Sequence, residues 1–319
     1  MNDIKESGLA KINNIIFICG ALRSGSTLFH LMLNSHPNII NPGEYDFLFD
    51  KITSNGGFPE IEKYREYLLS DRIFNSKFLE VDESLEYSDL IKSFIEQMKD
   101  GNKILAINIH RNFEHAYKMF PDARFIHLLR DPRDVASSSI GMNWAGNVYY
   151  GVDHWIETEK SWEKLLPLLK KKQHIEVRFE KLISDSVIVL NTVCDFIGTT
   201  YTNAMFDYQN NSTYSKPDIT LINQWKKKLS IQELQNVEFK AFDMMSLRNY
   251  ELSGSIIPPT MIRRVKLSSQ NYLYKIRKGI ERYGFVLFVL YRLTSRFGLK
   301  SWNTSLHYKV SNINTKHLK

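Results

Sequence analysis

Short apolar runs alternate with amphipathic segments along most of this chain. Residues 15–18 form a continuous apolar run, Ile-Ile-Phe-Ile, which is typical of a strand buried on both faces. Three more strands are predicted, at residues 103–109, 125–129 and 174–179. The segments between the runs place apolar residues at helical spacing, and the first of these helices ends just before Pro37. This alternation predicts a three-layer α/β sandwich with a mostly parallel central sheet.

A loop of small residues, Arg23-Ser24-Gly25-Ser26-Thr27, joins the first strand to the first helix. Such a turn presents free backbone N–H groups and the positive end of the helix dipole. Phosphate is the usual occupant of a site of this kind. The loop therefore predicts an anion site, although a plain turn with Ser26 or Thr27 as the N-cap would have the same sequence.

The same loop nearly matches the nucleotide-binding P-loop, G-x-x-x-x-G-K-[ST]. Gly20, Gly25 and Thr27 are in register, but Ser26 stands where the lysine is expected. That lysine normally contacts the β- and γ-phosphates, so its absence argues against hydrolysis of ATP or GTP. Arg23 supplies a positive charge earlier in the loop instead.

A second stretch, residues 123–139, repeats the pattern of strand, turn and helix. Arg130 directly follows the apolar strand, and a turn that contains Pro132 leads into a helix that carries Ser138. In open α/β sheets, ligands bind beyond the carboxyl ends of the strands. We therefore expect Arg130 and Ser138 to face one cleft.

Together, the two stretches resemble the family of sulfotransferases that use 3′-phosphoadenosine 5′-phosphosulfate (PAPS), over roughly residues 14–230. The resemblance is closest to a bacterial branch that is similar to tyrosyl-protein and carbohydrate sulfotransferases. It implies a fold like that of the P-loop nucleotide kinases. It also implies an enzyme that moves a sulfuryl group from PAPS to an acceptor hydroxyl.

The resemblance also implies a role for each loop. Arg130 and Ser138 hold the 3′-phosphate, the group that distinguishes PAPS from ordinary adenine nucleotides. Arg23 stabilises the charge that develops on the departing phosphate oxygen. The 5′-phosphosulfate is held by Arg23, Ser24, Gly25, Ser26 and Thr27. No metal is expected, since the sequence has no His/Cys/Asp cluster with the spacing of metal ligands.

Glu44 is the expected catalytic base. It follows the first helix in the sequence Gly43-Glu44, a context like that in which the family places its catalytic glutamate. A carboxylate beside the leaving group can take the proton of the attacking hydroxyl, an effect of roughly 10²–10⁴-fold in rate. The alternative is a solvated loop glutamate.

Three further residues are candidates for contacts with the donor. Relatives often carry a lysine in a Lys-x-Pro context at the end of the third strand, whereas this chain has Asn108 followed by His110 and Arg111. Either His110 or Arg111 could balance charge near the sulfonate, or either could be structural. Lys216, which precedes Pro217, resembles a lysine in a mobile loop over the nucleotide in relatives; the alternative is an exposed loop lysine.

The acceptor is less well defined. Residues 140–155 are rich in glycine, amide and aromatic side chains, which either stack on a sugar or aromatic acceptor or belong to the core. The aromatic residues are Trp144, Tyr149, Tyr150 and Trp155. This segment and the basic C-terminal region favour a saccharide or glycolipid acceptor, while a peptide tyrosine and a small alcohol stay open.

Charge is distributed unevenly along the chain. The net charge is +7, but residues 255–319 hold 13 basic residues and one acidic residue, Glu281, which gives them +12 and leaves −5 for residues 1–254. We expect a sulfotransferase domain over residues 1–254 and a basic amphipathic C-terminal extension over residues 255–319. Residues 275–297 predict one basic helix, which lies on an anionic membrane surface, binds a partner or packs back on the domain.

The sequence also bears on the cellular location of the protein and on two competing functions. Cys19 and Cys194 suit core positions in a reducing compartment, and neither a secretory signal nor an apolar run of ~20 residues is present. We expect a cytoplasmic protein, or one peripheral on the inner face of the membrane. Two other classes stay open: a nucleoside triphosphate-dependent kinase, and a non-catalytic membrane- or nucleic-acid-binding protein. Nucleic acid is not expected, because the apolar residues of the extension suit a lipid surface better than a groove.

Overall fold

A five-stranded parallel sheet forms the centre of the protein in the computed structural model, which describes residues 15–210, 212–297, 306, 309–310 and 313. The strand order within this part of the chain is β2-β3-β1-β4-β5, and every neighbouring pair is parallel. The strands are β1 (Ile15–Gly20), β2 (Ile39–Ile40), β3 (Ile104–Ile109), β4 (Arg124–Leu129) and β5 (His174–Arg178). The expected fold class is thereby confirmed.

Strand β1 lies in the middle of the sheet, and both of its faces are buried. Ile16 and Ile18 belong to one hydrophobic cluster, whereas Phe17 and Cys19 belong to another on the opposite face. Phe17 stacks on Phe125 of β4, with ring centroids 5.6 Å apart. Because successive side chains point to opposite faces, a strand covered on both sides needs apolar residues at every position.

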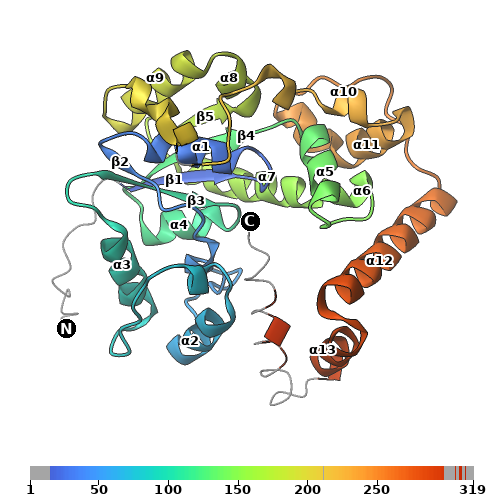
Figure 1. The fold of residues 1–319 in the computed structure, drawn as a ribbon, viewed down its shortest axis with the longest axis horizontal. Helices are drawn as coiled ribbons and strands as arrows, with labels where there is room; N and C mark the ends of the chain where they lie inside the picture. The colour runs from blue at the N-terminus through green and yellow to red at the C-terminus, as the bar shows by residue number, and fades with distance from the viewer. Residues whose placement is uncertain (1–14, 211, 298–305, 307–308, 311–312, 314–319) are drawn as a thin grey trace.

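Helices cover both faces of the sheet and complete three layers (Figure 1). One face is covered by α1 (Ser26–Asn34), α8 (Phe179–Ser184) and α9 (Ser186–Ile197). The other face is covered by α3 (Tyr87–Met98), α4 (Phe113–Met119) and α7 (Asp153–Leu165), with α2 (Ile61–Ser70) packed outside them. The short 3-10 segments between them are η1 (Asp46–Leu48), η2 (Phe74–Ser76), η3 (Leu166–Leu168), η4 (Asn203–Asn210) and η5 (Ile219–Leu221).

A third cluster lies beyond the carboxyl ends of β1 and β4. It joins α5 (Pro132–Gly141), α6 (Val148–Gly151) and α11 (Ile231–Leu247), next to α10 (Trp225–Lys228). Helix α5 begins where its sequence predicts, because the Asp131 carboxylate accepts a hydrogen bond from the Arg133 N–H and Pro132 occupies the first turn. This packing holds the second motif stretch against the end of the sheet.

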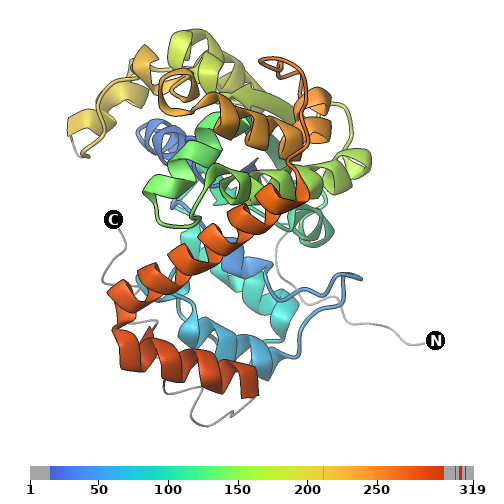
Figure 2. The same ribbon diagram turned by 90° about the vertical axis from the view of Figure 1, so that its right-hand side faces the viewer.

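The C-terminal region differs from its prediction. Instead of one helix over residues 275–297, the chain forms α12 (Met261–Tyr283) and α13 (Phe285–Phe297), and it turns between them (Figure 2). Gly284 lies at the break with a φ of 75°, a conformation that glycine adopts without steric cost. The expectation of a single helix is therefore wrong. In the described ranges, no helix is both long and apolar enough to span a bilayer.

Candidate active site

The loop after β1 is wound tightly around Gly25. The residue has a φ of 91°, and a Cβ at this position would overlap the Phe179 ring, so only glycine fits. Arg23 also lies in the left-handed region, with a φ of 72°. Gly25 is the N-cap of α1, which has no side-chain cap. The alternative in which Ser26 or Thr27 caps the helix is therefore wrong, and the first N–H groups of α1 have no capping side chain.

Ser24 lies at the bottom of this loop. Its backbone N–H donates to the Ala21 carbonyl at 3.0 Å, and its side chain is fully buried. The Ser24 hydroxyl has no hydrogen-bond partner among the described residues. Buried polar groups are nearly always paired, so the unpaired Ser24 hydroxyl is free to bond a ligand oxygen if the loop binds the expected anion.

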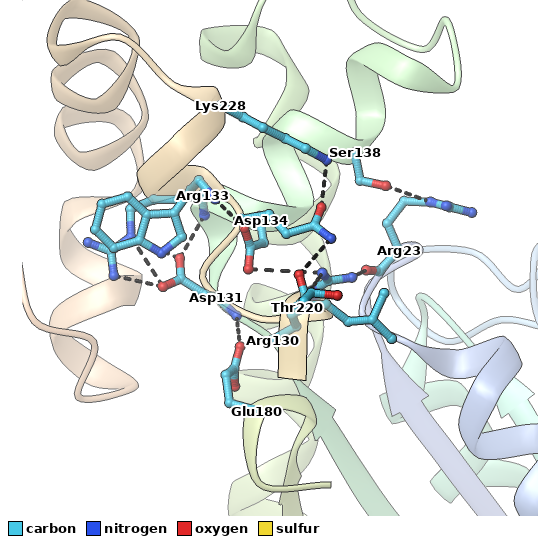
Figure 3. Close-up of polar contacts among 12 residues, drawn as sticks. Arg23, Arg130, Asp131, Arg133, Asp134, Ser138, Glu180, Thr220 and Lys228 are labelled. Atoms are coloured by element: carbon cyan, nitrogen blue, oxygen red, sulfur yellow. Dashed lines mark hydrogen bonds and ion pairs between the residues drawn. The ribbon is translucent and has the colours of Figure 1, made fainter. Parts of the chain in front are cut away.

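The two motif stretches meet at Arg23 (Figure 3). The Arg23 Nε donates to Ser138 Oγ at 2.9 Å, and Arg130 Nη1 donates to the Arg23 carbonyl at 3.0 Å. Arg130 Nη2 donates to the Leu221 carbonyl at 2.8 Å, and its guanidinium lies 4.3 Å from the Phe179 ring centroid. Burial lowers the pKa of Arg130, and its Nε has no partner in the described part of the protein. An anion beside this guanidinium would replace the hydrogen bonds to water that Arg130 loses on burial.

A buried ionic network supports this junction, and the sequence analysis did not identify it. Arg133 pairs with Asp131 at 2.7 Å and with Glu238 at 2.8 Å, and its guanidinium lies 3.9 Å from the Trp225 ring centroid. The Asp134 carboxylate accepts from the Trp225 backbone N–H at 2.7 Å, and burial raises its pKa. The only local signal is the charged run Asp131-Pro132-Arg133-Asp134 directly after a strand.

Glu44 is fixed at the carboxyl end of β3 by a parallel bridge to Asn108. The Tyr45 N–H donates to the Asn108 carbonyl, and the Asn108 N–H donates to the Gly43 carbonyl, both at 3.0 Å. Glu44 and the loop residue Thr27 border the same cavity of about 230 Å³, so the expected base and the anion loop share one space. The cavity is lined by Thr27, His30, Gly43, Glu44, Ile73, Ser76, Lys77 and Asn108.

His110 lies behind Glu44 and is almost fully buried. Its Nδ1 lies 2.7 Å from Asp46 Oδ2, and its backbone N–H donates to Asp46 Oδ1 at 2.7 Å. Its Nε2 has no hydrogen-bond partner among the described residues and lies 3.8 Å from Glu44 Oε1. Burial disfavours the charged ring, but the carboxylates of Asp46 and Glu44 outweigh it and raise the pKa of His110.

Lys77, rather than Arg111, supplies the cation that lines the cavity. Arg111 forms a two-pronged pair with Asp50, through Nε at 2.6 Å and Nη2 at 2.5 Å. Lys77 donates to the Pro42 carbonyl at 2.7 Å, and burial lowers its pKa while the nearby Glu44 opposes that shift. No sequence pattern marks Lys77, because it follows η2 in a segment without a motif.

Lys216 is exposed. Within the described ranges it forms no hydrogen bond or ion pair with Arg23, Arg130 or Ser138. Its role in holding the nucleotide stays a prediction.

The aromatic residues of segment 140–155 differ in burial: some belong to the core and others lie at the surface. Trp155 is fully buried, and its Nε1 donates to the Arg130 carbonyl at 3.0 Å, so of the two alternatives for this residue the core position is correct. Tyr149 and Tyr150 are half-buried and hold the Lys240 ammonium 4.1 and 4.3 Å from their ring centroids. Trp155 therefore holds the backbone just after the carboxyl end of β4 and does not contact a ligand.

Comparison with known proteins identifies the family. The model of the sulfotransferase family matches residues 15–203, more than half of the chain. An uncharacterized protein of Aquifex aeolicus is 26% identical over 211 residues, which are 60% of this chain but only 26% of that protein. The chain thus spans about a quarter of the length of this curated relative.

Solved structures agree on the fold. The sulfotransferase domain of the Synechococcus PCC 7002 olefin synthase superposes with a TM-score of 0.55 at 19% identity, over 78% of this chain and 98% of that domain. The sulfotransferase domain of the curacin biosynthetic pathway gives 0.53 at 20% identity, over 76% of this chain and all of that domain. With the family match over residues 15–203, the conclusion is that this chain belongs to the sulfotransferase family of enzymes.

Proposed function

We propose that this protein transfers a sulfuryl group from PAPS to an acceptor hydroxyl and releases adenosine 3′,5′-bisphosphate. The observation that carries the proposal is the junction of the two anion-binding stretches, where Arg23 contacts Ser138 at 2.9 Å and Arg130 contacts the Arg23 carbonyl at 3.0 Å. A donor with phosphates at both ends needs two adjoining anion sites. An ordinary nucleoside triphosphate needs only one.

The donor-binding residues follow from this junction. The loop N–H groups, the Ser24 hydroxyl and the Arg23 guanidinium would hold the 5′-phosphosulfate, while Arg130 and Ser138 would hold the 3′-phosphate. Two buried polar atoms without partners in the described chain, Ser24 Oγ and Arg130 Nε, support this assignment. Each charge-assisted hydrogen bond to phosphate contributes on the order of 1.5–3 kcal/mol.

Glu44 is the proposed base. The acceptor oxygen attacks sulfur and forms the new S–O bond, and its proton passes to the Glu44 carboxylate. The S–O bond to the 5′-phosphate breaks, and its electron pair stays on the phosphate oxygen. The pKa of His110 is raised, and Asp46 lies on the other side of its ring. Both observations favour a protonated His110 that orients Glu44. They disfavour a role for His110 as the group that accepts the proton.

Lys77 is the proposed cation on the acceptor side. Its ammonium borders the cavity together with Glu44, where it would lie beside the negatively charged sulfuryl group during transfer. His30 and Ser76 add polar lining to the same cavity, which supports an acceptor rich in hydroxyls. A saccharide or glycolipid is therefore the proposed acceptor class, and a tyrosyl peptide or small alcohol is the alternative.

Radiolabel transfer tests the proposal. The purified protein is incubated with ³⁵S-labelled PAPS and separate pools of saccharides, glycolipids, tyrosine-containing peptides and small alcohols. We expect label in one hydroxyl-bearing pool, adenosine 3′,5′-bisphosphate as the second product, and no phosphate transfer from γ-labelled ATP. Phosphate transfer from ATP without sulfate transfer would replace the proposal with a kinase.

A further inference from the structure

Helix α12 carries an exposed apolar stripe. Ile262, Val265 and Leu273 are 83%, 59% and 63% exposed. Scattered apolar residues are common on protein surfaces, whereas a contiguous set of them marks an interaction site. At 100° per residue, these three positions fall on one side of the helix. The stripe is therefore a continuous feature of the helix surface rather than a set of scattered residues.

The opposite side of α12 packs on the domain. Leu267 and Asn271 are buried, and the Leu267 carbonyl accepts from Asn147 Nδ2 at 2.8 Å. Asn271 Oδ1 accepts from the Gly146 N–H at 2.8 Å. Since residues four apart share a helix face, these contacts fix which side of α12 points away from the domain. The apolar stripe faces outward because the anchored side faces inward.

Helix α13 extends the exposed surface. It is anchored to α12 by Phe288, whose ring leaves no room for a Cβ at Gly279, and by Arg292, which lies over the Tyr272 ring at 5.6 Å. On its outer side, Val286 is 68% exposed and Leu293 is 46% exposed. Figure 2 shows α12 crossing the side of the molecule that faces the viewer, with α13 turned back below it.

Basic residues flank the stripe. Lys266 lies on one flank of α12 and Lys275 lies on the other, and both side chains are exposed. They belong to the segment with 13 basic residues and one acidic residue. An apolar stripe between two basic flanks is the pattern of a helix that lies in the interface of a bilayer, with cations at the headgroups and apolar side chains below them.

We infer that α12 and α13 bind an anionic lipid surface through this outward face. The charge of the segment complements acidic headgroups, and the large apolar residues complement the acyl boundary. A nucleic acid would use the lysines but would leave the apolar stripe in water. The inference does not depend on the proposed reaction, because the face is formed without any catalytic residue.

Vesicle flotation tests the inference with the full chain in the absence of nucleotide. We expect the protein to float with phosphatidylcholine vesicles that contain phosphatidylglycerol, to stay behind with phosphatidylcholine alone, and to detach as salt is raised. The triple variant Ile262→Ser/Val265→Ser/Leu273→Ser should reduce partitioning at least tenfold. The control Leu69→Ser/Ile188→Ser, which changes residues each 69% exposed on α2 and α9, should bind like the natural chain.

A charge variant gives a second measure. Lys266→Gln/Lys275→Gln should weaken binding to anionic vesicles by about fivefold per lysine. Both variants change exposed residues, so their circular dichroism and melting should match those of the natural chain. Equal binding by the triple variant would overturn the inference. A dimer that light scattering detects without vesicles, and that the triple variant abolishes, would also overturn the inference. The face would then contact a second copy of the chain.

Discussion

Glu44, His110 and Asp46 come from two separate loops, yet backbone and side-chain hydrogen bonds place them within one small region. The motif at Gly43-Glu44 identified only the first of them. Arg23, Arg130 and Ser138 were predictable because each lies in a local motif at the end of a strand, and the parallel sheet brings such ends together. Lys77 was not predictable, since its position depends on how η2 packs rather than on any sequence pattern.

Replacing Glu44 by glutamine tests the base. Glu44→Gln keeps the shape but removes the proton acceptor, so turnover should fall roughly 10²–10⁴-fold. The affinity for adenosine 3′,5′-bisphosphate, measured by calorimetry, should stay unchanged. Glu83→Gln, at an exposed position away from the cavity, is the matched control. Comparable losses of turnover and nucleotide affinity would remove Glu44 from this role.

Arg130→Ala tests the proposed 3′-phosphate site. It should weaken binding of adenosine 3′,5′-bisphosphate by at least 1.4 kcal/mol, about tenfold, because a charge-assisted hydrogen bond is lost. Adenosine 5′-phosphate should be affected much less. Arg72→Ala, at an exposed position, is the control. Similar weakening of the binding of both nucleotides would show that Arg130 does not bind the 3′-phosphate.

At the scale of elements, β1, β3 and β4 were predictable from their largely apolar runs, because a strand buried on both faces has few polar positions. The edge strand β5 is only partly buried, and it alternates Ile175 and Val177 with polar residues. Strand β2 was missed because Ile39–Ile40 is too short to show a period. The break at Gly284 was missed because apolar and basic residues continue on both sides of it, so no pattern separates α12 from α13.

The loop between β1 and α1 gives a prediction at this scale. Gly25→Ala should destabilise the fold by at least about 1–2 kcal/mol, from the cost of an L-residue at φ 91°, and contact with Phe179 adds to it. Chemical denaturation measures the loss. Gly254→Ala, where a Cβ meets nothing within 4 Å and the φ is not in the left-handed region, is the control. Unchanged stability of Gly25→Ala would contradict the tight loop.

At the scale of the whole molecule, buried ionic pairs tie the sheet to the layer that contains α7 and to the end of α11. His127 on β4 lies 3.1 Å from Glu159 on α7, which also pairs with Arg248 at 2.5 Å. Burial disfavours the charged ring, but Glu159 outweighs it and raises the pKa of His127. The apolar pattern of β4 gave no sign of a buried charge, because one histidine within a strand is compatible with a neutral core residue.

This pair predicts a pH dependence of stability. His127 has a higher pKa folded than unfolded, so its protonation stabilises the fold fully below its ordinary pKa of about 6.5. That contribution disappears as the pH rises through the folded pKa. The difference in unfolding free energy between the natural chain and His127→Gln should therefore shrink as the pH rises from 6 to 9 in urea titrations. A difference that grows with pH would contradict a protonated His127.

The contact between Arg23 and Ser138 has a consequence for the catalytic cycle. Under the proposed function, Arg130 and Ser138 hold the 3′-phosphate, which leaves chemically unchanged, and the loop after β1 still holds the 5′-phosphate once the sulfuryl group has departed. The spent nucleotide would then be held about as firmly as the fresh one. Release of adenosine 3′,5′-bisphosphate, rather than bond breaking, would then limit the rate, and the enzyme would slow down wherever a separate phosphatase does not remove this product.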